Sequence, residues 1–220
     1  MVEDLKLAVL YSNGKDSCYS TLLSLLSGKE IKCLITLIPA EDSLMFHNPF
    51  TDKIEEIKKF LPFPIIIKKC TNENELSVLK EVIAECIEKF QINGIVTGAI
   101  NSDYQRMRIN FVCEELNLPV FSFLWKKPYK TILEEEVSWL KFVIVKIMCE
   151  GLKKDLIGKI ITKEDLKELL SQKMFNPVFE GGEAETFTLY APFFAKEIKI
   201  KNKRVLEIDR YIYSLDGELE

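Results

Sequence analysis

Residues 7–26 read LAVLYSNGKDSCYSTLLSLL, so that a polar loop separates two apolar runs. The first run is short and rich in Leu, Val and Ala, as a buried strand is, and the second run has the content of a helix. The loop at 12–17 therefore lies where a strand ends and a helix begins. Unpaired N–H groups and the helix dipole make such a position favourable for a phosphate group.

The loop consists of polar residues and one glycine, namely Ser12, Asn13, Gly14, Lys15, Asp16 and Ser17. Glycine lets the backbone approach a ligand, lysine neutralises phosphate charge, and serine hydroxyls donate hydrogen bonds. Because we interpret the loop as a ligand site and not as core, we expect Lys15→Ala to leave the fold intact. The alternative is a plain helix N-cap in a polar loop.

The loop is not a Walker loop. Val9 stands where GxxxxGK[ST] requires its first glycine, and Asp16 follows the lysine in place of Ser or Thr. The shorter loop indicates a different way of holding phosphates from that of γ-phosphoryl transfer enzymes.

The first 125 residues alternate strand-like and helix-like patterns. Strands are expected over 5–11, 31–38, 64–69, 94–98 and 119–124, and helices over 15–28, 51–61, 72–91 and 102–116. Strict alternation of this kind predicts an α/β fold with a doubly wound, mostly parallel, Rossmann-like sheet. We assign residues 1–125 to this domain.

Residues 126–220 do not continue this strand–helix alternation and are expected to form a smaller α+β lobe. Helices are expected over 131–141 and 163–173, and strands over 142–149, 185–190, 195–201 and 204–213. Thr162 and Asp165 have the spacing of a capping box for the second helix. The last three strands have no helix between them, which favours antiparallel pairing. We expect the lobe to pack over the carboxyl edge of the first sheet, where doubly wound folds bind ligands.

Composition excludes several classes of protein. A formal net charge of −4 over 220 residues argues against a broad basic face for nucleic acid. The six cysteines form no CxxC pair and are interpreted as reduced core residues, and no apolar run approaches the ~18 residues of a membrane span. We expect a soluble, cytoplasmic protein. A metal site with two histidines is impossible, because His47 is the only histidine, and a lone histidine is usually structural or at the surface.

The stretch TGAINSDYQRMRINFVCEEL (97–116) runs from a strand into a helix. Ser102 and Gln105 have capping-box spacing, which places Arg106 and Arg108 near the positive end of the helix dipole. Arginines at that end of a helix suggest that they bind an anionic group, such as a phosphate or a carboxylate. The alternative is a solvated arginine pair on a surface helix.

The stretch NPVFEGGEAETFTLYAPFF (176–194) places Glu180, Glu183 and Glu185 around a Gly-Gly turn. Clustered carboxylates repel one another unless a cation or an array of donors compensates them, so Mg²⁺ or a cationic substrate group is plausible. The alternative is an acidic hairpin tip in water.

SNGKDS resembles the SGGKDS signature of the ATP-pyrophosphatase (PP-loop) superfamily, with Asn13 in place of a glycine. Asparagine tolerates left-handed backbone angles better than most residues. Further stretches resemble, in order, those of the diphthine–ammonia ligases of archaea and eukaryotes: MFHNP (45–49), GAINSDYQRMR (98–108), VKIMCEGL (145–152) and EGGEAET (180–186). Departures from that family are Asn13, Asn48 and Ala184.

The resemblance implies an adenine nucleotide alpha hydrolase-like fold and ATP-dependent amidation of diphthine on translation elongation factor 2. The carboxylate would be adenylated by ATP with Mg²⁺, and ammonia or ammonium would displace AMP after pyrophosphate leaves. No direct nucleic-acid binding and no membrane are expected, and a homodimer is left open. The alternatives are another PP-loop ATP-pyrophosphatase acting on tRNA and a non-catalytic nucleotide-binding module.

The same resemblance implies roles for particular residues. The loop 12–17 would bind ATP, with Asp16 also meeting the metal, and adenine would rest around Leu37 to Pro39. The catalytic candidates are Lys15, Asp16, Glu183 and Glu185. The substrate-binding candidates are His47, Ser102, Asp103, Tyr104, Gln105, Arg106, Arg108, Glu180, Gly181, Gly182 and Glu183.

Overall fold

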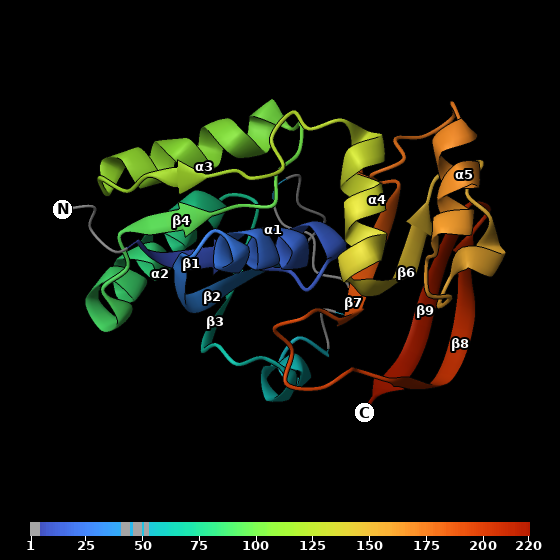
Figure 1. Ribbon diagram of the computed structural model, residues 1–220, viewed down its shortest axis with the longest axis horizontal. Coiled ribbons are helices and arrows are strands. Elements are labelled where there is room, and N and C mark those ends of the chain that lie inside the picture. Colours follow the sequence, from blue (N-terminus) through green and yellow to red (C-terminus); the bar gives the residue numbers. More distant parts are fainter. Residues whose placement is uncertain (1–4, 41–44, 46–49, 51–52) are drawn as a thin grey trace.

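The computed structural model describes residues 5–40, 45, 50 and 53–220, so that His47 and Asn48 lie outside the described part. Its first half holds a five-stranded parallel sheet in the order β3-β2-β1-β4-β5 (Figure 1). The strands are β1 Lys6–Leu10, β2 Glu30–Pro39, β3 Ile65–Cys70, β4 Gly94–Val96 and β5 Val120–Phe121. The helices are α1 Lys15–Leu26, α2 Glu75–Phe90 and α3 Asp103–Glu115. The prediction of a doubly wound parallel sheet is confirmed.

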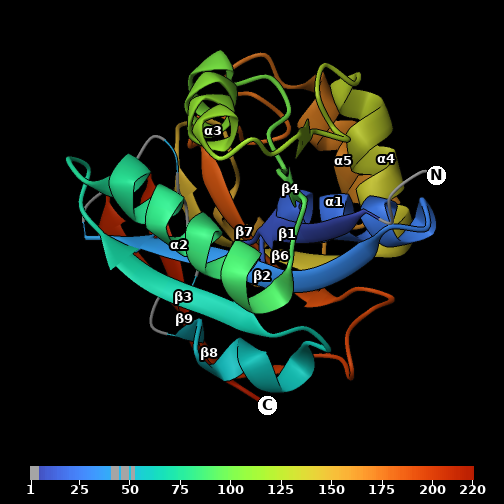
Figure 2. The ribbon, with the colours of Figure 1, turned by 90° about the vertical axis from the view of Figure 1, so that its left-hand side faces the viewer.

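Alternation along the strands places apolar side chains on both faces of this sheet. Leu7 and Leu34 belong to one buried cluster together with residues of α1. Ala8 and Cys33, the strand neighbours that point the other way, belong to a second cluster together with α2 and α3. Figure 2 shows α2 and α3 on the same side of the sheet. The inner strands β1, β2 and β4 are buried on both faces, which explains their nearly continuous apolar sequences.

The second half holds a four-stranded antiparallel sheet in the order β7-β6-β9-β8. Its elements are α4 Tyr129–Trp139, β6 Lys141–Met148, the 3-10 helix η3 Lys154–Leu156, α5 Lys163–Ser171, β7 Ala184–Tyr190, β8 Ile200–Asp209 and β9 Ile212–Leu219. Thr162 and Asp165 form the expected capping box at the start of α5. One cluster of buried apolar residues continues from β1 and α1 into β6 and β7, so the two sheets share a core.

The predicted helix over 51–61 is wrong in type and length. The described part of this segment contains only the short 3-10 helix η2, Glu56–Phe60. Leu61 is already extended, with φ −103° and ψ 138°, because the residue before a proline, here Pro62, is driven out of the helical region.

The predicted strands over 195–201 and 204–213 are also wrong in their boundaries. β8 runs through the expected turn, and Asn202, with φ 52°, lies where the β8–β9 register shifts between Lys201 and Arg204. Such a shift is a bulge, in which an extra residue is accommodated without ending the strand. The chain reverses later, at Arg210 and Tyr211, before β9.

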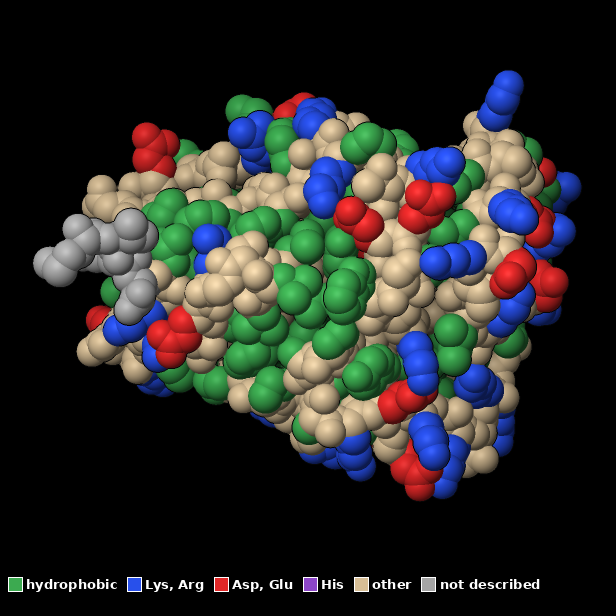
Figure 3. All heavy atoms as spheres, viewed as in Figure 1, with side chains coloured by type: hydrophobic (Ala, Val, Ile, Leu, Met, Phe, Trp, Pro, Cys, Tyr) green, Lys and Arg blue, Asp and Glu red, His purple; other side chains and the backbone are tan. Residues whose placement is uncertain are grey.

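On the face shown in Figure 3, hydrophobic side chains gather over the first half of the chain, and charged side chains of both signs crowd the second half. Within the described ranges, no helix is long and apolar enough to cross a membrane.

Candidate active site

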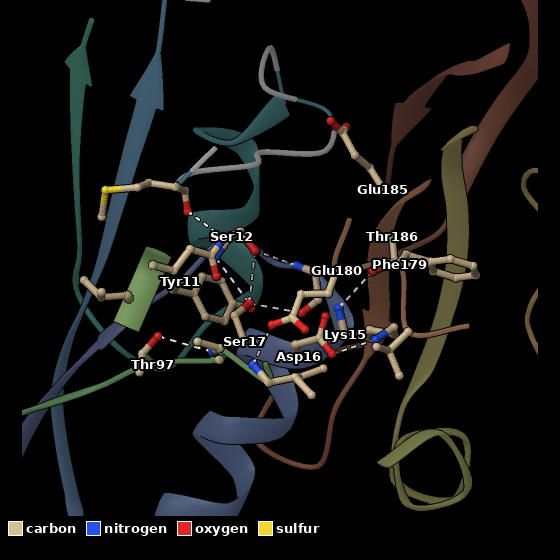
Figure 4. A pocket seen from close by; sticks show the side chains of 18 of the residues that line it. Tyr11, Ser12, Lys15, Asp16, Ser17, Thr97, Phe179, Glu180, Glu185 and Thr186 are labelled. Carbon is tan, nitrogen blue, oxygen red and sulfur yellow. Dashed lines mark hydrogen bonds and ion pairs between the residues drawn. The ribbon is translucent and has the colours of Figure 1, made fainter. Parts of the chain in front are cut away.

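A pocket opens at the carboxyl edge of the parallel sheet, where β1, β2 and β4 end and β7 begins (Figure 4). The loop 12–17 and the segment around Glu180 to Thr186 both line it. Ligands of open α/β sheets bind at this edge, outside the carboxyl ends of the strands. The pocket therefore brings together the two sequence stretches that we expect to meet ATP and substrate.

The first turn of α1 lies at this pocket, where the Lys15 N–H donates to Thr186 Oγ1 at 3.1 Å and no hydrogen bond of the Asp16 or Ser17 N–H is seen among the described residues. The N-cap residue of α1 is Gly14, which has no side chain to accept a hydrogen bond from these N–H groups. The hydroxyls of Ser12 and Ser17, 3.3 Å apart, line the same space. An uncapped helix end flanked by hydroxyls suits the phosphates of a nucleotide.

Asn13 fixes the shape of the loop. Its φ of 61° is in the left-handed region, and its side chain is fully buried. The Asn13 Oδ1 accepts a hydrogen bond from Tyr11 Oη at 2.7 Å, and the Asn13 Nδ2 donates to the Thr188 carbonyl oxygen at 3.0 Å. Asparagine at this position therefore supplies the left-handed backbone and two hydrogen bonds that glycine cannot make.

Gly98, which follows β4, allows the sheet and α1 to approach closely. A Cβ atom on Gly98 would lie 3.1 Å from the carbonyl carbon of Asp16 and from the backbone nitrogen of Ser17. Both neighbours are backbone atoms of the loop 12–17 and cannot rotate away. Glycine at this position therefore sets the position of the loop.

Lys15 is buried, so the expectation that it lies outside the core is wrong. Its side chain is 1% exposed, and its Nζ lies 2.6 Å from Asp16 Oδ1 and 3.3 Å from Glu136 Oε2 on α4. Burial lowers the pKa of Lys15, but the carboxylates of Asp16 and Glu136 outweigh burial and raise its pKa overall. Burial raises the pKa of Glu136 well above its usual range, against the attraction of Lys15. Lys15 is thus a buried ammonium group that lies beside two carboxyl groups, those of Asp16 and Glu136.

Glu180 caps the N-terminus of α3 from the other half of the chain. Its Oε1 accepts hydrogen bonds from the backbone N–H groups of Ile100 at 3.0 Å, Asn101 at 2.5 Å and Ser102 at 2.9 Å. Three N–H donors offset the charge of this carboxylate. Ser102 itself accepts from the Gln105 N–H at 3.3 Å, so half of the predicted capping box is formed, and Glu180 takes the place of the other half.

Glu183 and Glu185 have different surroundings. Glu183 holds the Gly-Gly turn, because its two oxygens accept from the N–H groups of Asn176 at 3.0 Å and Gly181 at 2.9 Å. Glu185 lines the pocket from β7, with its Oε1 3.9 Å from Lys146 Nζ. In Figure 4 Glu185 stands apart from Glu180.

The candidates on α3 divide into two groups. Gln105 lines the pocket, whereas Tyr104, Arg106 and Arg108 are not among its lining residues. The Arg106 guanidinium stacks 4.5 Å from the Trp125 ring centroid. Arg108 lies 4.8 Å from the Tyr104 ring centroid and pairs with Glu75 at 3.2 Å. Contact of these arginines with a ligand stays a prediction, as does the role of Asp103 and of His47.

Sequence reasoning missed several residues that shape the site, namely Glu136, Thr186 and Thr188. A signal existed for Glu136, because it follows Ile132 and precedes Leu140 by four residues each, on the core face of its helix. A charge on an apolar face is an indication of a buried pair. The threonines lie in an ordinary strand pattern and gave no such signal.

Two family models match most of the chain. The model of the diphthamide synthase N-terminal domain matches residues 5–120, and the model of the diphthamide synthase C-terminal domain matches residues 128–217. The diphthine–ammonia ligases of Bos taurus and Homo sapiens are each 32% identical over 228 residues, covering 92% of this chain and 85% of the relative. A crystal structure of a predicted subunit of tRNA methyltransferase from Methanocaldococcus jannaschii aligns with a TM-score of 0.47 and 17% identity, covering 88% of this chain and 99% of that one.

A parallel sheet with a Gly-Lys-Asp-Ser loop after its first strand, facing a carboxylate-bearing second lobe, defines an ATP-dependent ligase of the PP-loop type. Among such enzymes, both domain models and the curated relatives point to one family. The chain belongs to the diphthine–ammonia ligase family.

Proposed function

We propose that this enzyme adenylates the carboxylate of diphthine on translation elongation factor 2 and that ammonia then displaces AMP to give the amide. The observation that carries this proposal is that the phosphate loop and the carboxylate-bearing segment 180–186 line one pocket. A carboxylate is a poor acyl donor until its oxygen becomes part of a good leaving group, and adenylation supplies one. Both reactants therefore need to lie in a shared space.

ATP is assigned to the half of the pocket next to α1. The N–H groups of the first helical turn and the hydroxyls of Ser12 and Ser17 hold the β- and γ-phosphates. Apolar side chains at the opposite wall, Ile35, Leu37 and Met45, offer a surface for adenine. In this arrangement the α-phosphorus faces the second lobe, and pyrophosphate is the leaving group.

Mg²⁺ fits the donor set through Asp16, whose side chain is 31% exposed and lines the pocket. Magnesium commonly binds one or two protein carboxylates, with water and substrate phosphates completing its coordination. Among the described residues, no group of three His, Cys, Asp or Glu side chains is arranged to hold a metal ion by itself. When bound, the ion would neutralise charge on the departing pyrophosphate.

Glu185 is our choice for the cationic partner, either the trimethylammonium group of diphthine or ammonium before it loses its proton. Glu180 and Glu183 already accept backbone N–H hydrogen bonds, which offset their charges. Glu185 lines the pocket from β7, where an attacking amine would approach the acyl group.

The test uses purified protein, elongation factor 2 bearing diphthine, labelled ATP, Mg²⁺ and either ammonium or glutamine. The expected products are AMP, pyrophosphate and a peptide in which a carboxylate has become an amide, with ammonium sufficient by itself. ADP as the nucleotide product, or a strict requirement for glutamine, would contradict the proposal. AMP formation that depends on tRNA would assign the enzyme to another PP-loop reaction.

A further inference from the structure

Lys15 lines the pocket, but its ammonium group is already paired inside the protein, with Asp16 and Glu136. Figure 4 shows Lys15 joined to Asp16, and the Lys15 side chain is 1% exposed, whereas that of Asp16 is 31% exposed. A phosphate group that binds Lys15 therefore has to compete with these two carboxyl groups for its Nζ.

Glu136 is the second group that holds Lys15 in place, and it comes from α4, outside the phosphate-binding domain. Its side chain is 0% exposed, and neither of its oxygens has a hydrogen-bond partner among the described residues. Its Oε2 lies 3.3 Å from the Lys15 Nζ. Burying a carboxyl group with so few compensating hydrogen bonds is costly, and an apolar residue of similar volume would often be no less stable. This cost suggests that Glu136 serves the site more than the stability of the fold.

We propose that Glu136 is a positioning residue that pairs with the Lys15 ammonium in the ATP-free enzyme and gives it up to the phosphates when ATP binds. The inference rests on ATP binding by the loop 12–17, as in the proposed function, and not on the identity of the acyl substrate. Lys15 then pairs with Glu136 when ATP is absent and with a phosphate of ATP when ATP is bound.

This exchange has a thermodynamic consequence. The free energy that stabilises the pairing of Lys15 with Glu136 is lost when ATP binds, so it reduces the apparent affinity for ATP. Removing the Glu136 carboxyl group should therefore tighten ATP binding. If the role of Glu136 is purely structural, removing it should weaken ATP binding or leave it unchanged, because a loosened site binds less well.

The experiment measures the dissociation constant of MgATP by calorimetry for the parent and for Glu136→Met, Glu136→Gln and Glu134→Met. Methionine removes the acceptor at similar size, and glutamine keeps an oxygen but no charge. Glu134→Met makes the same change two residues earlier on α4, where the side chain is 54% exposed. We expect Glu136→Met to bind MgATP roughly three- to tenfold more tightly, Glu136→Gln to show a smaller gain and Glu134→Met to match the parent.

Steady-state kinetics provide the second readout. The KM for ATP should fall in Glu136→Met while kcat does not rise. Unchanged or weaker ATP binding in a folded Glu136 variant would overturn the inference while leaving the proposed function in place, provided the parent still forms AMP and pyrophosphate. If Glu136→Met does not fold, Glu136→Gln provides the test, and it too should bind MgATP more tightly than the parent. Failure of the parent to bind ATP would overturn both.

Discussion

The side-chain amide of Asn13 donates a hydrogen bond to the carbonyl oxygen of Thr188 at 3.0 Å, across 175 residues of sequence. The Thr188 N–H returns a hydrogen bond to the Asn13 carbonyl oxygen at 2.9 Å. Two residues away on each segment, the Lys15 N–H donates to Thr186 Oγ1 at 3.1 Å. The phosphate loop of the parallel sheet is thus bonded to β7 of the antiparallel sheet, and its shape depends on both.

Asn13→Ala should destabilise the protein more than Asn13→Gly. Both changes remove the hydrogen bonds to Tyr11 and Thr188, but alanine also keeps an unfavourable left-handed backbone at φ 61°. We expect a loss on the order of 2–4 kcal/mol for alanine, and about 1–2 kcal/mol less for glycine. Urea denaturation midpoints measure the difference. Equal losses would mean that the left-handed backbone carries no cost here.

Lys15→Ala should lower stability even without ATP. The change leaves Glu136 buried without its cation, and breaking a buried pair in this way typically costs about 3–5 kcal/mol. The double variant Lys15→Ala/Glu136→Met should recover most of that loss, because it removes both charges. Thermal or urea unfolding of the two single variants and the double variant forms the required cycle. Additive losses would show that the two residues do not interact.

Glu180→Ala should destabilise the junction between the second lobe and α3. Three backbone N–H groups, those of residues 100–102, lose their shared acceptor, and the helix dipole loses its anion. The expected loss is on the order of 1–3 kcal/mol, with Glu180→Gln intermediate. Glu168→Ala, which removes an exposed partner of Lys153, is the control and should change the urea midpoint little. A Glu180→Ala variant as stable as the control would contradict the capping role.

The native protein should react with a thiol reagent at one cysteine out of six. Five cysteines are buried and Cys149 is partly exposed. Burial raises the pKa of the Cys18 thiol and of the Cys113 thiol to about 12, so neither forms thiolate at pH 8. Titration with a chromogenic disulfide should count one thiol in buffer and six in denaturant. Fast reaction of two or more thiols in the native state would show that the core opens readily.

The sequence predicted those features that depend on local pattern. The parallel strands and the helix starts at Lys15 and Asp103 follow from the residues around them, and the left-handed backbone of Asn13 is one that asparagine tolerates. The turn between β8 and β9 was misplaced, because Asn202 suits both a hairpin turn and a bulge, and only pairing with β9 decides between them.

The candidate site was predicted as a set of segments but not as a set of contacts. Loop 12–17 and segment 180–186 line one pocket, while the roles proposed for their individual residues stay predictions. The burial of Lys15 could not be predicted, since it depends on Glu136 and on where α4 packs. The use of Glu180 as a helix cap depends on a contact across about 80 residues, which no local pattern encodes.

The bonding of the loop to β7 also determines when the enzyme becomes able to bind nucleotide during its synthesis. A nascent chain emerges from the ribosome N-terminus first, and the parallel sheet can form once β5 is out. At that stage the SNGKDS signature is complete, but Thr186 and Thr188, which bond to the loop, have not yet been made. We therefore expect ATP binding to begin only after β7 has been made, so that a chain interrupted earlier carries the signature without the site.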